Sequence, residues 1–284
     1  MATSVWTELD RRESPRMSSA ANPVKNNGFD QFELASPIRR AIAAAGFTEP
    51  RPVQHQTVPA ALEGRDILGL AQTGTGKTAA FAMPMLEHLL TGRSDRPRAL
   101  VVTPTRELAG QVADEIRRLA KFTRLRVATV FGGVSANRQI ADLRRRPDVI
   151  VACPGRLLDL MSQRVVSLRD IEVLVLDEAD HMFDMGFLPD VRRILAALPA
   201  ERQNLLFSAT MPSDIRKLAR QVLRRPHVVE IAHSRPTSTV RHALYAVESD
   251  QKVDVLREFL SDDDFSSACL LYTSPSPRDR TPHR

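Results

Sequence analysis

Residues 71–78 carry the groups that bind a polyphosphate, and they read Ala71-Gln72-Thr73-Gly74-Thr75-Gly76-Lys77-Thr78. The segment follows the apolar run 66–70 and opens a helical pattern, so its backbone N–H groups and the helix N-terminus face one anion. Gly74 and Gly76 let the loop curl round phosphate oxygens. Lys77 can reach the β and γ phosphates, and the Thr78 hydroxyl can ligate Mg²⁺. Because Ala71 stands where the general pattern has glycine, a tight strand-to-helix turn is the alternative interpretation of this segment alone.

A second segment, further along the chain, carries acidic side chains. Asp177-Glu178-Ala179-Asp180 follows the apolar run 172–176, which is typical of a buried parallel strand. The acids therefore emerge at the carboxyl end of a strand, where open α/β sheets bind their ligands. A solvated charge cluster is the ordinary explanation for such a run alone. Because both segments follow predicted strands in the correct order, together they predict a nucleoside triphosphatase site.

Further motifs stand in the order and approximate spacing of one family. They are an isolated Phe29 seventeen positions before Gly46, then Gly46-Phe47-Thr48-Glu49-Pro50-Arg51-Pro52-Val53-Gln54, Pro104-Thr105-Arg106-Glu107-Leu108-Ala109, Gly132-Gly133, Cys153-Pro154-Gly155-Arg156 and Ser208-Ala209-Thr210. With these motifs the chain resembles the DEAD-box ATP-dependent RNA helicases over residues 29–267. The amino-acid sequence of segments 184–187 and 204–212 is most similar to that of the bacterial RhlE-type group.

The resemblance implies an ATP site with three contributions outside the glycine-rich segment. Gln54 is expected to hydrogen-bond the adenine edge and Phe47 to stack on its face, which suits an amide that both donates and accepts. Phe29 is expected to brace this adenine pocket. Without the resemblance, Phe47 would be interpreted as core, Gln54 as a surface cap, and Phe29 as ordinary core packing.

The resemblance also assigns roles to the acidic segment. Asp177 is expected to hold Mg²⁺ together with Thr78, and Glu178 to orient the attacking water and accept its proton. With Lys77, these two acids form the expected catalytic set. Asp180 is expected to bridge towards the segment Ser208-Ala209-Thr210 and so to couple nucleotide state to nucleic acid. A plain strand-end turn is the alternative for Ser208 and Thr210.

Three segments are expected to contact RNA, all predicted just beyond strand carboxyl ends. They are Pro104-Thr105-Arg106, Gly132-Gly133 and Pro154-Gly155-Arg156. Glycine amides and arginines suit backbone phosphates, so binding should tolerate any sequence and weaken with salt. Cys153 is a departure, because the family usually has threonine there, so a hydroxyl donor to phosphate is in doubt.

The composition agrees with a globular protein. The chain has 284 residues, of which 43% are hydrophobic, which is ample for a core. It has no apolar run of about eighteen residues and no charged-then-apolar leader, so we expect a cytoplasmic protein with no membrane association. The two cysteines, Cys153 and Cys269, lack metal-ligand spacing. The net charge of +6 suits a polyanionic partner, although solubility explains such a charge equally well.

Apolar runs that alternate with helical patterns predict the fold. Runs at 66–70, 99–103, 127–131, 149–152, 173–176, 205–207 and 228–231 are typical of strands, and helical patterns fall between them, as at 107–121 and 215–223. Such βαβ alternation predicts an α/β fold with a parallel sheet flanked by helices. By resemblance this is a RecA-like P-loop NTPase domain, over residues 29–232.

The flanking segments are expected to lie outside this domain. Residues 1–28 have the composition of a disordered lead-in, and Met17 is an alternative start. Residues 233–240 are typical of a linker, and 241–267 of the start of a second RecA-like domain, with a strand at 240–247 and a helix at 251–260. We expect residues 268–284 to be an artefact of misassembly, and a natural disordered tail is the alternative.

The family's arginine finger belongs to the second domain, so we expect this chain to bind Mg·ATP and RNA weakly and hardly to turn over. Loss of such a finger costs about 10³ to 10⁵ in rate. The predicted function of the complete protein is ATP-dependent RNA unwinding. The alternatives are a non-catalytic ATP- and RNA-binding module and a DNA-directed P-loop motor. The RhlE-type resemblance suggests ribosome assembly or RNA decay as the context.

Overall fold

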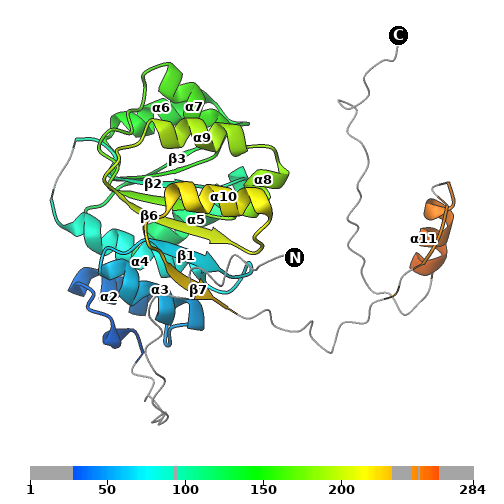
Figure 1. Ribbon diagram of the computed structural model, residues 1–284, viewed down its shortest axis with the longest axis horizontal. Coiled ribbons are helices and arrows are strands. Elements are labelled where there is room, and N and C mark those ends of the chain that lie inside the picture. Colours follow the sequence, from blue (N-terminus) through cyan, green and yellow to red (C-terminus); the bar gives the residue numbers. More distant parts are fainter. Residues whose placement is uncertain (1–27, 93–94, 232–242, 244, 249, 262–284) are drawn as a thin grey trace, which may run out of the picture. The chain divides into compact units, whose positions relative to one another are not determined.

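A seven-stranded sheet forms the centre of the part of the chain from residue 28 to residue 231 (Figure 1). The computed structural model describes residues 28–92, 95–231, 243, 245–248 and 250–261. The strand order is β3-β4-β2-β5-β6-β1-β7, and every neighbouring pair is parallel. The strands are β1 (Ile67–Leu70), β2 (Ala99–Val102), β3 (Val127–Val130), β4 (Val149–Ala152), β5 (Val173–Leu176), β6 (Gln203–Ser208) and β7 (His227–Glu230).

Helices precede the sheet and connect its strands, as parallel pairing requires. They are η1 (Gly28–Gln31, a 3₁₀ turn), α2 (Ser36–Ala44), α3 (Pro52–Leu62), α4 (Lys77–Leu90), α5 (Arg106–Leu119), α6 (Ala136–Arg144), α7 (Pro154–Ser162), α8 (Ala179–Asp184), α9 (Leu188–Ala196) and α10 (Ser213–Val222). These elements confirm the predicted α/β fold, and the predicted strands and helices of the first domain differ from the observed bounds by no more than two residues.

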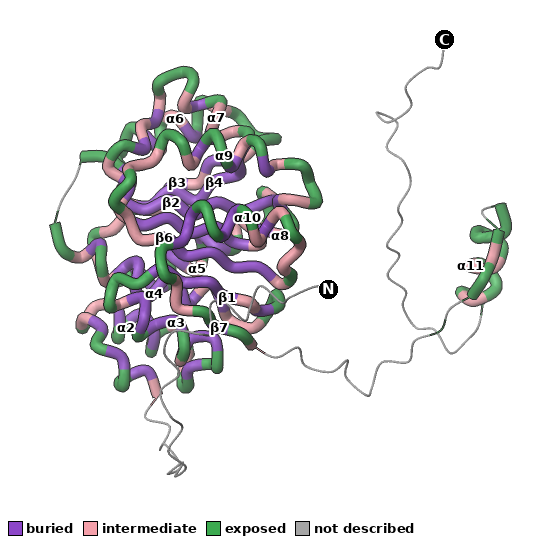
Figure 2. The backbone as a smooth tube through the Cα atoms, viewed as in Figure 1, coloured by how far each residue is buried: buried purple, intermediate pink, exposed green. Residues whose placement is uncertain are grey.

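Successive strand residues are buried on opposite faces of the sheet, so the domain has two apolar cores (Figure 2). Ile67, Val101 and Val175 pack with residues of helices α2–α5. Leu100 and Leu174 pack on the other face with residues of α6–α10. Both faces are covered, which explains why the strand sequences are continuous apolar runs.

Gly69 and Phe207 lie close together on two central strands of the sheet. They are register partners across β1 and β6, and the Phe207 ring lies 5.6 Å from that of Phe81 in α4, centroid to centroid. A Cβ at position 69 would lie 2.3 Å from the ring atom Cδ1 of Phe207. Only glycine therefore leaves room for this ring, in the strand that leads into the glycine-rich loop.

The chain divides into two units after His233. In the second unit, α11 (Lys252–Leu260) confirms the predicted helix, and the Tyr245 ring lies edge-on to that of Phe259 at 4.7 Å. The described residues of the predicted strand at 240–247 form no strand, because a strand requires a pairing partner and the described part of this unit offers none. The predicted linker (233–240), the tail (268–284) and positions 1–27 of the lead-in lie outside the described residues.

No helix among residues 28–92, 95–231 and 250–261 is long and apolar enough to cross a membrane.

Candidate nucleotide site and nucleic-acid interface

The glycine-rich loop joins β1 to α4 in a shape that requires both of its glycines. Gly74 and Gly76 have φ angles of +83° and +95°, which side chains other than glycine rarely adopt. A Cβ on Gly76 would also lie 2.7 Å from Nε2 of Gln54. No side chain caps the N-terminus of α4, so its first backbone N–H groups are available to an anion.

Asp177 is a buried carboxylate at the carboxyl end of β5, and its exposed fraction is 2%. Burial raises the pKa of Asp177 to about 6, although the positive charge of Lys77 opposes that shift. Its Oδ1 atom has no hydrogen-bond partner. A buried carboxylate oxygen without a partner suits a cation ligand, so Asp177 fits the Mg²⁺ role. Within the described ranges, no group of three or more His, Cys, Asp or Glu side chains could hold a metal ion by itself.

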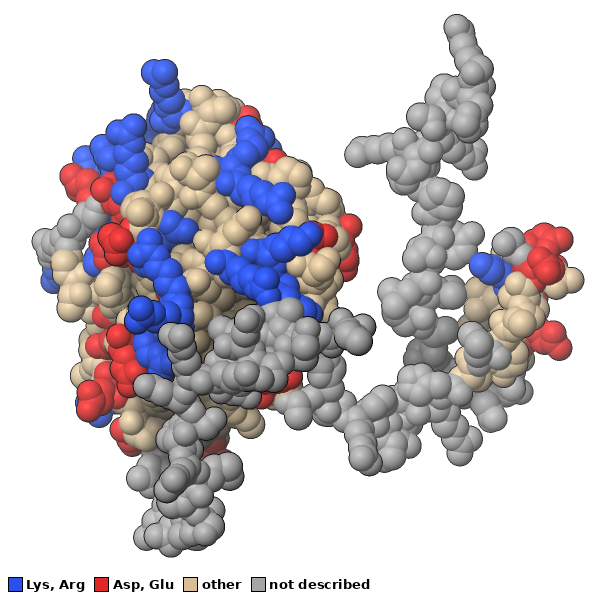
Figure 3. All heavy atoms as spheres, in the orientation of Figure 1, with Lys and Arg blue, Asp and Glu red and all other residues tan. Residues whose placement is uncertain are grey.

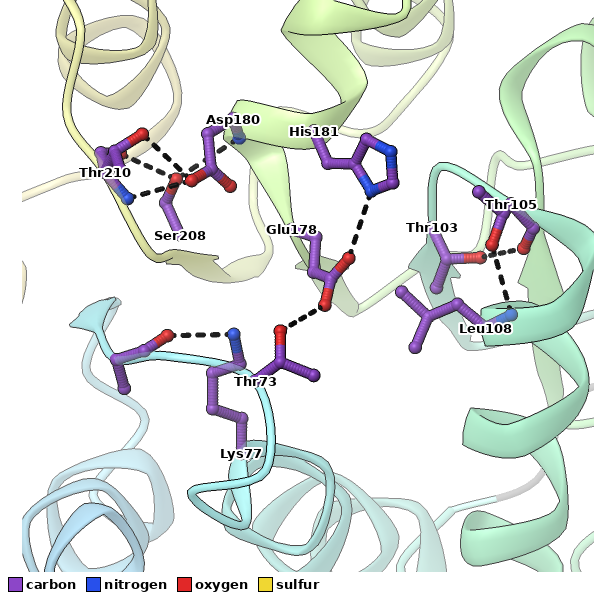
Figure 4. A network of polar contacts seen from close by, with 11 residues as sticks. Thr73, Lys77, Thr103, Thr105, Leu108, Glu178, Asp180, His181, Ser208 and Thr210 are labelled. Carbon is purple, nitrogen blue, oxygen red and sulfur yellow. Dashed lines mark hydrogen bonds and ion pairs between the residues drawn. The ribbon is translucent and has the colours of Figure 1, made fainter. Parts of the chain in front are cut away.

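Glu178 adopts a left-handed backbone conformation, with φ and ψ both 54°. Such strain in a residue other than glycine is characteristic of functional sites. Its carboxylate accepts hydrogen bonds from the Thr73 hydroxyl at 2.9 Å and from His181 Nδ1 at 3.4 Å (Figure 4). The acidic segment therefore contacts the glycine-rich loop directly. Lys77 is buried in the same region and donates from Nζ to the Ala71 carbonyl at 2.9 Å.

A pocket of about 400 Å³ brings most of the predicted nucleotide residues together. From the predicted set its walls contain Phe47, Gln54, Thr73, Gly74, Gly76, Lys77, Thr78, Asp177 and Glu178. Ala71, Gln72 and Thr75 lie in the loop but not in these walls. Phe29 is buried behind Phe47, with its ring edge-on at 5.9 Å, which is where a bracing residue would lie.

Gln54 caps a helix and lines the pocket at once. Its Oε1 accepts from the Arg51 backbone N–H at 2.9 Å and its Nε2 donates to the Gly76 carbonyl at 3.2 Å. The cap matches the alternative interpretation, but the side chain is buried rather than on the surface. One N–H and one lone pair of this amide take no part in these two bonds, so the side chain retains the capacity to recognise an adenine edge.

Asp180 and Thr210 connect α8 to the segment after β6. Asp180 Oδ2 accepts from both the backbone N–H and the hydroxyl of Thr210, each at 2.9 Å, and the Asp180 N–H donates to Ser208 Oγ at 3.2 Å (Figure 4). Burial alone would raise the pKa of Asp180, but the hydrogen bonds from Thr210 and Ser208 outweigh burial and lower it. The structure thus brings the predicted coupling residues together, with Ala209 between them in the chain.

Sequence reasoning gave no role to several residues of this region. The Arg51 guanidinium donates to the Gly74 carbonyl, and α5 supplies a pocket wall of Leu108, Gln111, Val112 and Glu115. Arg51 lies inside the motif that contains Gln54, so its position in the sequence could have indicated a role at the nucleotide site. The α5 wall depends on how that helix packs, which no motif records.

The three candidate RNA segments follow β2, β3 and β4, which are neighbours in the sheet. The loop after β3 comes close to both of the other segments. Arg156 Nη1 donates to the Val134 carbonyl at 3.4 Å, and Arg106 Nη1 would lie 3.1 Å from a Cβ on Gly133. Arg106, Arg156 and the Gly132-Gly133 loop therefore meet at one edge of the sheet.

Not every predicted RNA residue is exposed at this edge. Pro104 and Pro154 are buried, and the Thr105 hydroxyl caps α5 by accepting from the Leu108 N–H at 3.2 Å. Gly132 and Gly155 are exposed with Arg106. Cys153 is buried, burial raises the pKa of its thiol to about 11, and a hydrogen bond with Thr103 opposes that shift. The thiol is therefore neutral near pH 7.

The order of the strands separates two sets of segments along one sheet edge. The glycine-rich loop follows β1, the acidic segment follows β5, and the segment Ser208-Ala209-Thr210 begins at the end of β6. The candidate RNA segments follow β2, β3 and β4. A parallel sheet with this phosphate-binding loop defines a P-loop nucleotide-binding domain of the RecA-like type. Residues 51–218 match the DEAD/DEAH box helicase family, and the chain belongs to that family.

Relatives support this assignment. The chain is 43% identical to the ATP-dependent RNA helicase CshA of Listeria monocytogenes, over 82% of this chain and 45% of the relative. It is 42% identical to the DEAD-box ATP-dependent RNA helicase RhpA of Helicobacter pylori, over 82% and 47%. The chain thus spans about half the length of the curated relatives it matches. The RhlE-type subgroup stays a prediction.

Solved structures are similar as well. A DEAD box protein from the hyperthermophile Methanococcus jannaschii matches with a TM-score of 0.68 and 34% identity, over 84% of this chain and 64% of that one. A hypothetical ATP-dependent RNA helicase from Sulfolobus tokodaii matches with a TM-score of 0.65 and 41% identity, over 70% and 57%.

Proposed function

We propose that this chain is the ATP-binding part of a cytoplasmic ATP-dependent RNA helicase, which couples hydrolysis of Mg·ATP to local separation of RNA strands. The observation that carries the proposal is the divided sheet edge. Nucleotide segments follow β5, β6 and β1, and candidate RNA segments follow the adjacent strands β2, β4 and β3. The relatives described above are named as RNA helicases, which supports the same activity.

In this proposal each pocket residue has one task. Lys77 leaves the Ala71 carbonyl to neutralise the β and γ phosphates. Asp177 and Thr78 hold Mg²⁺, which when bound withdraws charge from the phosphates. Glu178 accepts a proton from the attacking water, and its bonds with Thr73 and His181 orient it. The Asp180–Thr210 link transmits the state of the pocket to the sheet edge.

RNA is held by its backbone in this mechanism. Arg106 and Arg156 would neutralise phosphates, and amides of the Gly132-Gly133 loop would donate to them. Such contacts carry no base code, so the RNA sequence is left open. Ribosome assembly or RNA decay is the setting that we propose from the RhlE-type resemblance.

ATP hydrolysis measured with single-stranded RNA, with DNA of the same sequence and without nucleic acid tests the proposal. We expect stimulation by RNA and little by DNA, with slow turnover in this chain by itself. Lys77→Ala should lose ATP binding, and Glu178→Gln should bind ATP without hydrolysing it. Equal stimulation by DNA would favour the DNA-directed motor, and ATP binding without any hydrolysis by the complete protein would favour the non-catalytic module.

A further inference from the structure

The helices α9 and α10, with the turns that follow them, form a basic surface outside the site described above. We define the α9–α10 surface as residues 188–202 and 213–226. Both helices pack on the same face of the sheet through buried residues such as Val191 and Leu218. Figure 3 shows Lys and Arg side chains gathered over this face.

The charge of this surface is unbalanced, because it has eight Lys or Arg residues against three Asp or Glu. Every carboxylate is already paired, in Arg193–Asp190 at 3.5 Å, Lys217–Asp214 at 3.0 Å and Arg224–Glu201 at 3.2 Å. Of the eight cationic side chains of this surface, five guanidinium groups have no carboxylate of a described residue within ion-pair distance. They are Arg192, Arg202, Arg216, Arg220 and Arg225.

Like charges also face one another within the α9–α10 surface. Burial and the neighbouring charge of Arg224 lower the pKa of Arg202. Arg202 instead donates to neutral oxygens, among them Oδ1 of Asn204 at 2.8 Å. An anion bound here would relieve this repulsion, and a guanidinium can engage phosphate with two parallel hydrogen bonds.

The position of the surface connects it to the sheet edge. The helix α9 packs against α7, which begins at the candidate RNA segment with Pro154. The helix α10 begins at Ser213, three residues after Thr210. A polyanion that lies on the edge can therefore continue onto this face.

We propose that the α9–α10 surface is a second RNA-binding surface, which binds the phosphate backbone of RNA that continues past the sheet edge. The proposal rests on the proposed function, since it names further contacts to the same RNA. Because the surface offers exposed guanidinium groups without a recognition cleft, its contribution is salt-dependent and independent of base sequence.

The test compares two matched double variants in RNA binding measured by fluorescence anisotropy. Arg192→Gln with Arg220→Gln removes two exposed charges from the surface. Arg39→Gln with Arg124→Gln removes two exposed charges elsewhere, from residues that also form no ion pair with a described residue. Each protein is titrated with single-stranded RNA of about 6 and about 30 nucleotides over a series of salt concentrations. The shorter RNA lies near the lower end of the footprint of about 4 to 16 nucleotides that is usual for one small domain, and the longer RNA exceeds it.

We expect the surface variant to bind the long RNA on the order of tenfold more weakly, with a salt slope reduced by about 1.4 for two lost contacts. Its affinity for the short RNA and for ATP should be unchanged, and the control variant should match wild type. If the two double variants bind the long RNA equally well, the surface proposal is wrong while the proposed function stands. Failure of the wild-type chain to bind either RNA overturns both. Weakened binding of polyglutamate without weakened RNA binding would assign the surface to an acidic protein instead.

Discussion

The Thr73 hydroxyl donates a 2.9 Å hydrogen bond to the carboxylate of Glu178, which joins the glycine-rich loop to the acidic segment. The loop that would hold phosphate and the carboxylate that would activate water are thus fixed to one another. A phosphate that displaces Thr73 would also free Glu178, so the base would become available when its substrate arrives.

Asp177→Asn should make the protein more stable at pH 8 while removing the proposed Mg²⁺ ligand. Burial raises the pKa of Asp177 from 3.8 to about 6, so the folded chain binds this proton more tightly than the unfolded chain. The ionised carboxylate therefore destabilises the fold fully above pH 6, and this effect disappears as pH falls through the window from 6 to 3.8. We expect a gain on the order of 1 to 3 kcal/mol at pH 8.

Urea unfolding of wild type and variant at several pH values measures this gain. Asp114→Asn is the control, because the Asp114 side chain is 73% exposed, and it should show no such window. A stability difference that does not shrink between pH 8 and pH 4 would contradict the assignment of the raised pKa to Asp177.

Thr210→Val should separate nucleotide binding from RNA binding. It removes the hydroxyl that donates to Asp180 Oδ2 but leaves the pocket walls intact. We expect ATP affinity to stay within about twofold of wild type. The factor by which RNA raises ATP affinity should fall towards one, from the roughly 5- to 150-fold typical of coupled sites.

Titration of ATP with and without saturating RNA gives this factor. Thr210→Ser restores a hydroxyl at nearly the same place and should recover it. Unchanged coupling in the valine variant would show that the hydroxyl bond from Thr210 to Asp180 carries no signal.

Arg51→Ala should weaken ATP binding more than it slows hydrolysis. The Arg51 guanidinium supports the glycine-rich loop at the Gly74 carbonyl and lines the same pocket. We expect KM for ATP to rise several-fold with kcat little changed, because the loop loses a support and not a reacting group. Arg51→Lys keeps one positively charged donor and should recover part of the lost affinity for ATP. A fall in kcat at unchanged KM would contradict the role of Arg51 as a support of the loop.

Gly69→Ala should destabilise the fold through a clash with Phe207. The new Cβ would lie 2.3 Å from the ring, which is itself packed on Phe81, so overpacking should cost about 1 to 3 kcal/mol. Gly110→Ala in α5 meets nothing within 4 Å and should be neutral or stabilising, by up to about 1 kcal/mol. Equal denaturation midpoints for the two variants in urea would refute the packing argument.

Sequence reasoning predicted the sheet because each strand is an apolar run buried on two faces, as Val173–Leu176 illustrates. It also located the loop, because Gly74 and Gly76 mark backbone conformations that only glycine adopts easily. It could not foresee that Pro104 and Pro154 are buried, since a motif does not state which of its residues face solvent. The support from Arg51 and the α5 wall was missed because both depend on packing between elements distant in sequence.

The strand order has a consequence for engineering. Because the loops proposed for nucleotide and for nucleic acid follow separate groups of adjacent strands, we expect that the turns after β2, β3 and β4 could be exchanged while those after β1, β5 and β6 stay in place. The same domain could then bind a different nucleic acid and still use the same nucleotide. The hydrogen-bonded junction of β2 with β5 would be the part that such a redesign has to leave untouched.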